Sequence, residues 1–387
     1  MSVGTVGFVA DRLRQAREAR GLTLVALADL VDLSSASISH YEKGEHTPRA
    51  DALQKLARAL NVPVSFLLKE KSVSVQANVF YRSMSAATKQ ARSRAERRYE
   101  WLKEIVDYLQ RYVEFPALNL PAYDPPDDFR EITNLEIESL AEYTRDYWRL
   151  GSGPIVDLVR TLESNGMIVS RGRLGGEHLD AFSEYDPIQD RPYIFLGSDK
   201  GVMVRSRFDA GHELFHVLAH RKVNRSALRK ASDFKVLETQ AHRFALALLL
   251  PGKSFTDELW DVSLDSFRSM KARWKTAIAA MIFRAEQLEL IDEEGAKRLR
   301  INLSRRGWRR GEPLDDLPAE QPTMIARSIE MIVNEQVAKP SQILEDLCIP
   351  SHDVEELAGL PQGYFGNYED PEGPNLKKPS NVVSFRR

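Results

Sequence analysis

The sequence predicts a mainly α protein with one small β-sheet, an α+β class, divided into more than one domain. Segments with helical spacing of apolar residues account for most of the 387 residues, which is typical of amphipathic helices. Short β-type runs separated by turn residues occur between 167 and 197, and they indicate a small sheet. A chain of this length exceeds one ordinary domain, so we expect two or three.

Composition limits the classes of function. An apolar fraction of 43% and a charged fraction of 28% are typical of globular proteins. No apolar run is long enough to span a bilayer, and residues 1–15 lack the pattern of a signal peptide, so we expect no membrane partner. The single cysteine, Cys348, has no partner for an internal disulfide, which fits the cytoplasm as the expected location.

Residues 8–70 are predicted to form a first domain that contains a helix-turn-helix. Thr23 can cap a helix over LVALADLV, and after a short turn Ser34 can cap a second helix over SASISHYEKG. The apolar residues of the two segments have the spacing of small helices packed at a steep angle. Such a pair leaves its second helix available for the major groove of DNA.

The segment 20–62 resembles the Cro/repressor-type (XRE) DNA-binding domain. It contains the elements S-x-x-x-I-S-x-Y-E-x-G and P-x-x-x-x-L-x-x-L-A-x-A-L. The resemblance implies that the chain binds double-stranded operator DNA as a homodimer. It also implies a groove-facing surface formed by Ser35, Ala36, Ser37, Ser39 and His40.

One position departs from that family. The family often has Gln directly after the capping Thr, whereas this chain has Leu24. The recognition residues are small, so few bidentate contacts of the Arg–guanine or Gln–adenine kind are available. We therefore expect sequence-specific affinity to be modest or to depend on dimerisation. The alternative interpretation is a helical module that binds only protein.

Residues 71–135 are predicted to be a basic helical linker followed by a proline-rich segment. Between 71 and 104 there are eight Lys or Arg residues and three Asp or Glu residues. The basic helix at 89–103 has two interpretations. It can contact DNA phosphates, or it can be a solvated helix face that supports a dimer or a linker.

The decapeptide GHELFHVLAH at 211–220 contains three histidines and one glutamate in an otherwise apolar segment. It belongs to the first of two predicted helices, 207–222 and 234–250. His212 and His216 stand four residues apart, so both imidazoles lie on one helix face and can reach one zinc ion. Glu213 can take a proton from an attacking water, as in the H-E-x-x-H arrangement of metallopeptidases. The alternative is a hydrogen-bonded pair of core histidines.

A zinc site needs a third ligand from another element. His220 is excluded because residues at i, i+4 and i+8 span about 12 Å along a helix, so we expect it to pack or hydrogen-bond in the core. The next helix offers Glu238, with small apolar residues below it for close packing against the first helix. His242, one turn after Glu238, is the rival ligand.

The segments FDAGHELFHVLAH and ETQAHRFALALLLP are similar to those of the ImmA/IrrE zinc metallopeptidases. The resemblance spans roughly 150–255 and implies a zincin-like domain at 136–255. It implies Zn²⁺ as the cofactor, with His212, His216 and Glu238 as ligands and Glu213 as the general base. Two positions depart from the family, since Phe215 replaces a usual Gly and His242 a usual Asn. Neither change removes a ligand.

Residues 256–365 are predicted to be a helical C-terminal region, and 366–387 a disordered tail. The basic block at 297–313 can contact nucleic acid or an acidic partner, or it can be a solvated cap. A strand at 191–197 is expected to offer its edge to an extended peptide.

Together these features predict a DNA-binding transcriptional regulator fused to a zinc endopeptidase. The resemblance to the ImmA/IrrE family implies that the substrate is a regulatory protein cleaved in response to stress or induction, either a repressor, an antitoxin-like partner or the chain itself. The first alternative is a regulator whose metal domain is a non-proteolytic sensor, which would not need Glu213 beside its ligands. The second is the DNA-binding member of a toxin–antitoxin or phage operon.

Overall fold

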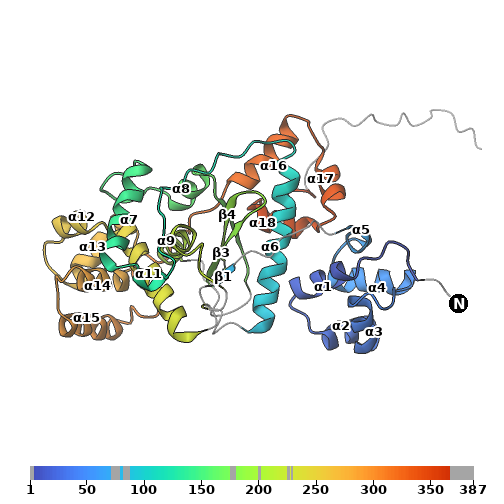
Figure 1. Cartoon of the computed structure of the whole chain (residues 1–387), viewed down its shortest axis with the longest axis horizontal. Helices are drawn as coiled ribbons and strands as arrows, with labels where there is room; N and C mark the ends of the chain where they lie inside the picture. Colours follow the sequence, from blue (N-terminus) through green and yellow to red (C-terminus); the bar gives the residue numbers. More distant parts are fainter. Residues whose placement is uncertain are drawn as a thin grey trace, which may run out of the picture.

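The computed structural model is mainly helical with one small sheet, as predicted. Figure 1 shows helices α1–α5 at one end, the sheet in the middle and helices α11–α15 at the other end. Two predicted segments lie partly outside the described residues: the tail, at residues 367–387, and the basic linker, at residues 71–78 and 82–87. The structure describes residues 4–70, 79–81, 88–174, 180–198, 202–224, 227 and 230–366. No helix in these segments has both the length and the apolar content needed to cross a membrane.

The first helices form the predicted helix-turn-helix. The hydroxyl of Thr23 accepts a hydrogen bond from the amide of Ala26, and the hydroxyl of Ser34 accepts one from Ser37. Both predicted caps are therefore confirmed, and each holds an amide that has no partner within its helix. The elements are α1 (Ala10–Ala19), α2 (Leu24–Val31), α3 (Ser35–Glu42), α4 (Ala50–Leu60) and α5 (Val64–Leu68).

The described part of the chain contains one four-stranded sheet, with strand order β1-β3-β4-β2. Strand β4 pairs antiparallel with β3 and parallel with β2, and β1 pairs antiparallel with β3. The strands are β1 (Val79–Tyr81), β2 (Ile168–Gly172), β3 (Ala181–Asp186) and β4 (Arg191–Gly197). The three strands predicted between 167 and 197 are confirmed, whereas β1 was not predicted.

The expected free edge at 191–197 is wrong. Strand β4 has a partner on each side, and residues 192–196 are buried. A strand with this near-continuous apolar run belongs in the middle of a sheet covered on both faces. A peptide cannot extend the sheet at this strand.

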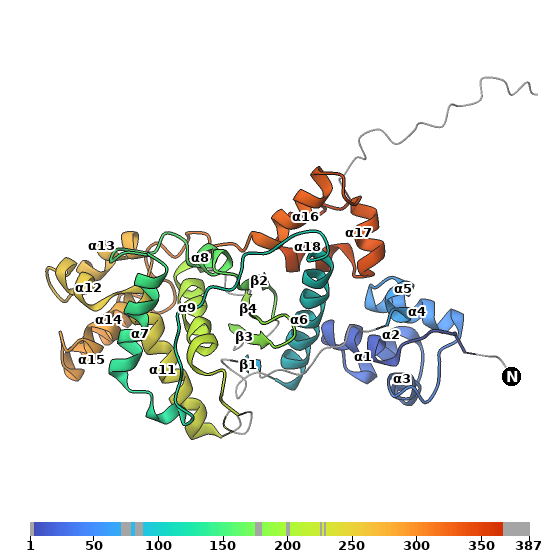
Figure 2. The ribbon, with the colours of Figure 1, turned by 45° about the horizontal axis from the view of Figure 1, so that its top comes forward.

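Two long helices cover the opposite faces of the sheet, α6 (Lys89–Leu109) and α9 (Met203–Ala219) (Figure 2). Successive strand residues point to opposite faces. Phe182 therefore faces α6, where its ring lies 6.0 Å from that of Tyr99. Its neighbour Ala181 belongs to the core on the α9 side. The sheet thus separates two hydrophobic cores, one of which also contains the helix-turn-helix.

The core on the α9 side is completed by helices from residues 129 to 305. The predicted helical span 263–300 is divided into three helices by Lys275 and Glu289, which have φ values of 51° and 58°. The elements are η1 (Phe129–Glu131), α7 (Asn134–Tyr147), α8 (Leu158–Ser164), α11 (Ala231–Leu249), α12 (Gly252–Glu258), α13 (Leu264–Trp274), α14 (Ile278–Gln287) and α15 (Glu293–Arg305).

The last described helices return to the other core. Helices α16 (Met324–Asn334), α17 (Pro340–Leu347) and α18 (Ser351–Ala358) share a core with α6 and the helix-turn-helix. Arg20 donates to both carboxylate oxygens of Asp353, at 2.9 and 2.7 Å. The predicted C-terminal region 256–365 therefore contributes to both cores.

Candidate metal centre and DNA-binding surface

Helices α9 and α11 pack together and bring the three predicted ligands to one point. The Nε2 atoms of His212 and His216 lie 3.0 Å apart. Glu238 Oε1 lies 3.6 Å from the first nitrogen and 3.5 Å from the second. A tetrahedral zinc ion with ligand distances of about 2.1 Å holds its ligand atoms about 3.4 Å apart. The donor atoms and the triangle they form therefore fit a zinc ion.

A buried hydrogen-bond chain sets the protonation of His216. Gln240 donates from Nε2 to the carbonyl oxygen of Phe129 at 2.8 Å, so its Oε1 faces Nε2 of His220, 3.0 Å away. His220 must then donate from Nε2, which leaves Nδ1 to accept. That atom lies 2.7 Å from Nδ1 of His216. His216 consequently carries its proton on Nδ1, and the lone pair of Nε2 points to the ligand triangle.

Burial keeps His220 in the neutral form that this hydrogen-bond chain requires. The side chain is fully buried. Burial lowers the pKa of His220 well below its usual value, and proximity to His216, when that ring is protonated, acts in the same direction. The prediction that His220 hydrogen-bonds in the core is confirmed. Its partner Gln240 was not predicted, although it lies only two residues after Glu238 on the same helix.

The predicted base Glu213 is fully buried on α9, where it faces the sheet. Ser183 of β3 donates from its hydroxyl to Glu213 Oε2 at 2.6 Å. Ser183 was not predicted either. The available signal was a small polar residue between Phe182 and Glu184, in a strand position that packs against α9.

The rival ligand His242 also lies beside the centre. One donor atom each from His212, Glu238 and His242 fall within 4.8 Å of one another. The rings of His212 and His242 are 4.9 Å apart between centroids. This group is wider than the triangle with His216, so it fits a zinc ion less closely.

The predicted DNA-facing residues share the outer side of α3. Ser35 and Ala36 are exposed, whereas Ser37, Ser39 and His40 are partly exposed. Ile38, between them, is fully buried and anchors the helix in the domain core. The imidazole of His40 contacts the carboxylate of Glu45 in the following loop, and this hydrogen bond lowers the pKa of Glu45.

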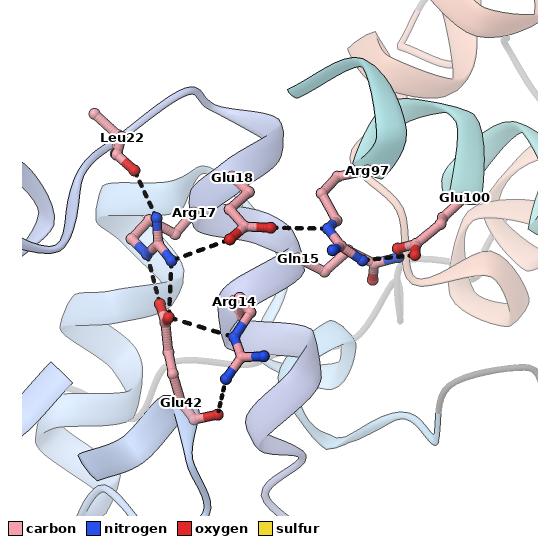
Figure 3. A network of polar contacts seen from close by, with 8 residues as sticks. All are labelled: Arg14, Gln15, Arg17, Glu18, Leu22, Glu42, Arg97 and Glu100. Atoms are coloured by element: carbon pink, nitrogen blue, oxygen red, sulfur yellow. Dashed lines mark hydrogen bonds and ion pairs between the residues drawn. The ribbon is translucent and has the colours of Figure 1, made fainter. Parts of the chain in front are cut away.

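The basic helix α6 uses its arginines inside the molecule. Arg97 donates to Glu18 of α1 at 2.8 Å and to Glu100 at 2.6 Å (Figure 3). Arg98 pairs with Glu356 of α18 at 2.8 Å. These contacts argue against a phosphate-binding role for these two side chains. They also contradict a solvated face, because α6 is the support on which the helix-turn-helix packs.

Comparisons with known proteins agree with this arrangement. Residues 13–67 match the helix-turn-helix family model, and residues 162–285 match the peptidase M78 model, described as the IrrE N-terminal-like domain. The chain is 38% identical over 58 residues to the HTH-type transcriptional regulator SutR of Escherichia coli (strain K12). That match covers 15% of this chain and 33% of the relative, so it spans about a third of SutR.

Among solved structures, one match is ComR from S. thermophilus in complex with DNA and its signalling peptide ComS. It is 12% identical, covers 89% of this chain and 97% of that one, and has a TM-score of 0.15, which is too low to show a shared fold. The chain joins an XRE-type helix-turn-helix DNA-binding domain to an ImmA/IrrE-type metallopeptidase-family domain, and both predicted resemblances are confirmed.

Proposed function

We propose that the chain is a DNA-binding regulator whose IrrE-like domain is a zinc endopeptidase. In this proposal His212, His216 and Glu238 hold Zn²⁺. The carrying observation is the hydrogen-bond chain from Gln240 through His220, which leaves the lone pair of His216 Nε2 directed at the ligand triangle. A pair of core histidines does not need a carboxylate oxygen 3.5–3.6 Å from both rings.

The chain's own residues divide the remaining work of peptide hydrolysis. A bound zinc ion would polarise the scissile carbonyl and favour deprotonation of the attacking water. Glu213 would accept that proton and pass it to the leaving amine. Ser183 holds one carboxylate oxygen of Glu213 through its 2.6 Å hydrogen bond, so the base is held against β3 before a substrate arrives.

The substrate in this proposal is a regulatory protein, either a repressor, an antitoxin-like partner or the chain itself. The helix-turn-helix would bring the peptidase to operator DNA through the exposed side of α3. Because two-fold operators are read by two copies, we propose a homodimer. Sedimentation of the full chain with and without a selected operator tests this, and binding of a single copy to a duplex with two half-sites would contradict it.

A non-proteolytic sensor is the second candidate, and the position of His242 favours it. If His242 joined the other three side chains around the metal, the site would have four protein ligands. Structural zinc sites are closed in this way, whereas catalytic sites keep one position open. The 4.9 Å separation between the His212 and His242 rings makes this arrangement worth testing.

Metal content and cleavage measured on the same variants separate the two functions. We expect about one zinc per chain in the wild type, loss of zinc in Glu238→Ala, and retention in His242→Ala and Glu213→Gln. The wild type, but not Glu213→Gln, should cleave members of a proteome-derived peptide library. Loss of zinc in His242→Ala, without any cleavage by the wild type, would establish the closed sensor site instead.

A further inference from the structure

A pocket of about 700 Å³ opens directly beside the candidate metal centre. It lies between α9, α11, α14 and the loop that follows α15. Phe208 lies one turn before His212 on α9, and its ring is 5.4 Å from that of His242. Both Phe208 and His242 line the pocket. The pocket therefore lies next to the proposed site of cleavage.

The walls of the pocket are mainly apolar. The small side chains of Ala277, just before α14, and of Ala280, on α14, leave space, and the large side chain of Phe283 is 51% exposed. An exposed large apolar side chain beside a concavity is typical of a binding site. The main apolar lining residues are Phe208, Leu246, Ala277, Ala280, Phe283 and Trp308. This lining suits a large apolar side chain.

The rim of the pocket is positive. The two acidic lining residues, Glu312 and Asp315, both accept from Lys271, at 2.8 and 2.6 Å, so one of their two negative charges is compensated and the two rim arginines outweigh the other. Arg309 and Arg310 line the same rim and are exposed. Neither arginine forms an ion pair with any residue that the structure describes. A ligand with carboxylates beside its apolar group would complement this rim.

A peptide cannot pair as an additional strand with the strand next to Glu213. Strand β3, which carries Ser183, is paired on one side with β1 and on the other with β4. A peptide at this site therefore has to be recognised mainly by its side chains. The pocket is the feature of the site that can do this.

We propose that the pocket binds a large apolar side chain of a peptide whose neighbouring residues are acidic, adjacent to the bond that is cleaved. The position of the cleaved bond rests on the proposed peptidase function, whereas binding itself does not. Ala280 and Phe283 in the pocket would contact the apolar side chain, and the rim arginines Arg309 and Arg310 would pair with the acidic neighbours.

Binding is tested with the full-length, zinc-supplied Glu213→Gln variant, so that no probe is consumed. The probes are three fluorescein-labelled peptides read by anisotropy: Gly-Glu-Asp-Phe-Asp-Glu-Gly, its Phe-to-Ala analogue, and its analogue with four lysines in place of the acidic residues. Burial of a phenylalanine side chain corresponds to a gain in affinity of about tenfold or more over alanine. We expect the acidic phenylalanine peptide to bind at least about tenfold more tightly than either analogue.

Two pairs of variants locate the binding. Ala280→Trp fills the pocket and should weaken the phenylalanine peptide by about tenfold or more, whereas Ala272→Trp on the exposed side of α13 should not. The double variant Arg309→Glu and Arg310→Glu should reverse the preference to the lysine peptide. The same change at Lys297 and Arg298, exposed on α15, makes an equal change in charge away from the pocket and should leave the preference intact.

The outcomes separate this proposal from the proposed function. Equal affinities for the phenylalanine and alanine peptides would overturn the pocket proposal, as would equal effects of the two tryptophan variants in protein with unchanged melting temperature. Peptide binding in the absence of any zinc uptake or cleavage would support the pocket and refute the peptidase. Zinc uptake and library cleavage without selective peptide binding would do the reverse.

Discussion

Replacing Gln240 by Met tests whether the buried hydrogen-bond chain prepares His216 to bind metal. Methionine keeps the approximate volume of glutamine but neither donates nor accepts as an amide does. The substitution removes the acceptor 3.0 Å from His220 Nε2 and the donor 2.8 Å from the carbonyl oxygen of Phe129. Neither Glu238 nor His216 is changed.

Two effects of different size are expected. Loss of the direct partner of a metal-ligating histidine lowers metal affinity by about 10- to 100-fold, and because Gln240 acts on His216 through His220, we expect a loss at the lower end, about 10-fold. His220 now lacks the acceptor that fixes its tautomer, so His216 is free to protonate at Nε2, the position that the metal needs. The metal-free fold should also lose about 1–3 kcal/mol, because a buried carbonyl and a fully buried imidazole each lose a hydrogen bond.

Competition with a chromogenic chelator measures zinc affinity, and urea unfolding of the metal-free protein measures stability. The matched control is Gln287→Met. Gln287 is a partly exposed glutamine on α14, and its replacement leaves the hydrogen bonds among Gln240, His220 and His216 unchanged. The reasoning is refuted if Gln240→Met binds zinc as tightly as the wild type. A loss of stability without a loss of affinity would assign Gln240 a purely structural role.

Three further predictions concern the scaffold. Ser34→Ala removes the cap of α3 and should cost about 1 kcal/mol in urea unfolding, with weaker operator binding in a gel-shift assay. Asp353→Asn weakens the pairing with Arg20 and should cost about 1–3 kcal/mol, with faster hydrogen exchange in α18. Hydrogen bonds from Thr133 lower the pKa of Glu136 below its ordinary 4.5. The stability that ionised Glu136 contributes should therefore be fully present above its ordinary pKa and lost as the pH falls through the lowered pKa. The free energies of unfolding of the wild type and of Glu136→Gln, measured against pH, should therefore converge in acid.

Local patterns were sufficient to predict the caps, the helices and three of the strands. Thr23 and Ser34 act within three residues of their own position, so the sequence contains the whole interaction. Strand β1 was missed because its partner β3 lies about 100 residues later, and three residues in a basic segment carry too little pattern to indicate pairing. The arginines of α6 were misinterpreted for a related reason, since their acidic partners come from distant elements.

The ligands of the candidate centre were predictable, whereas the residues that hold them were not. His212 and His216 have a spacing that is specific to one chemistry. Ser183 and Gln240 act across the packing of β3 and α11 on α9, and a single serine or glutamine has no distinguishing pattern. The pocket is still less visible in the sequence, because it is formed by small residues of α14 and by a loop after α15.

The contacts between the helix-turn-helix and α6 determine whether proteolytic cleavage between them would separate the two. Arg12 of α1 is fully buried and donates to both carboxylate oxygens of Glu104 on α6, at 2.5 and 3.0 Å. The ring of Phe66 packs edge-on against that of Trp101, 5.7 Å away. Separation of the helix-turn-helix from α6 would expose the buried rings of Phe66 and Trp101 to water, at a cost of about 2 kcal/mol or more. Cleavage in the segment that joins α5 to α6 would therefore leave the helix-turn-helix attached to α6, and size-exclusion chromatography after cleavage of that segment by an added protease should show both fragments in one peak.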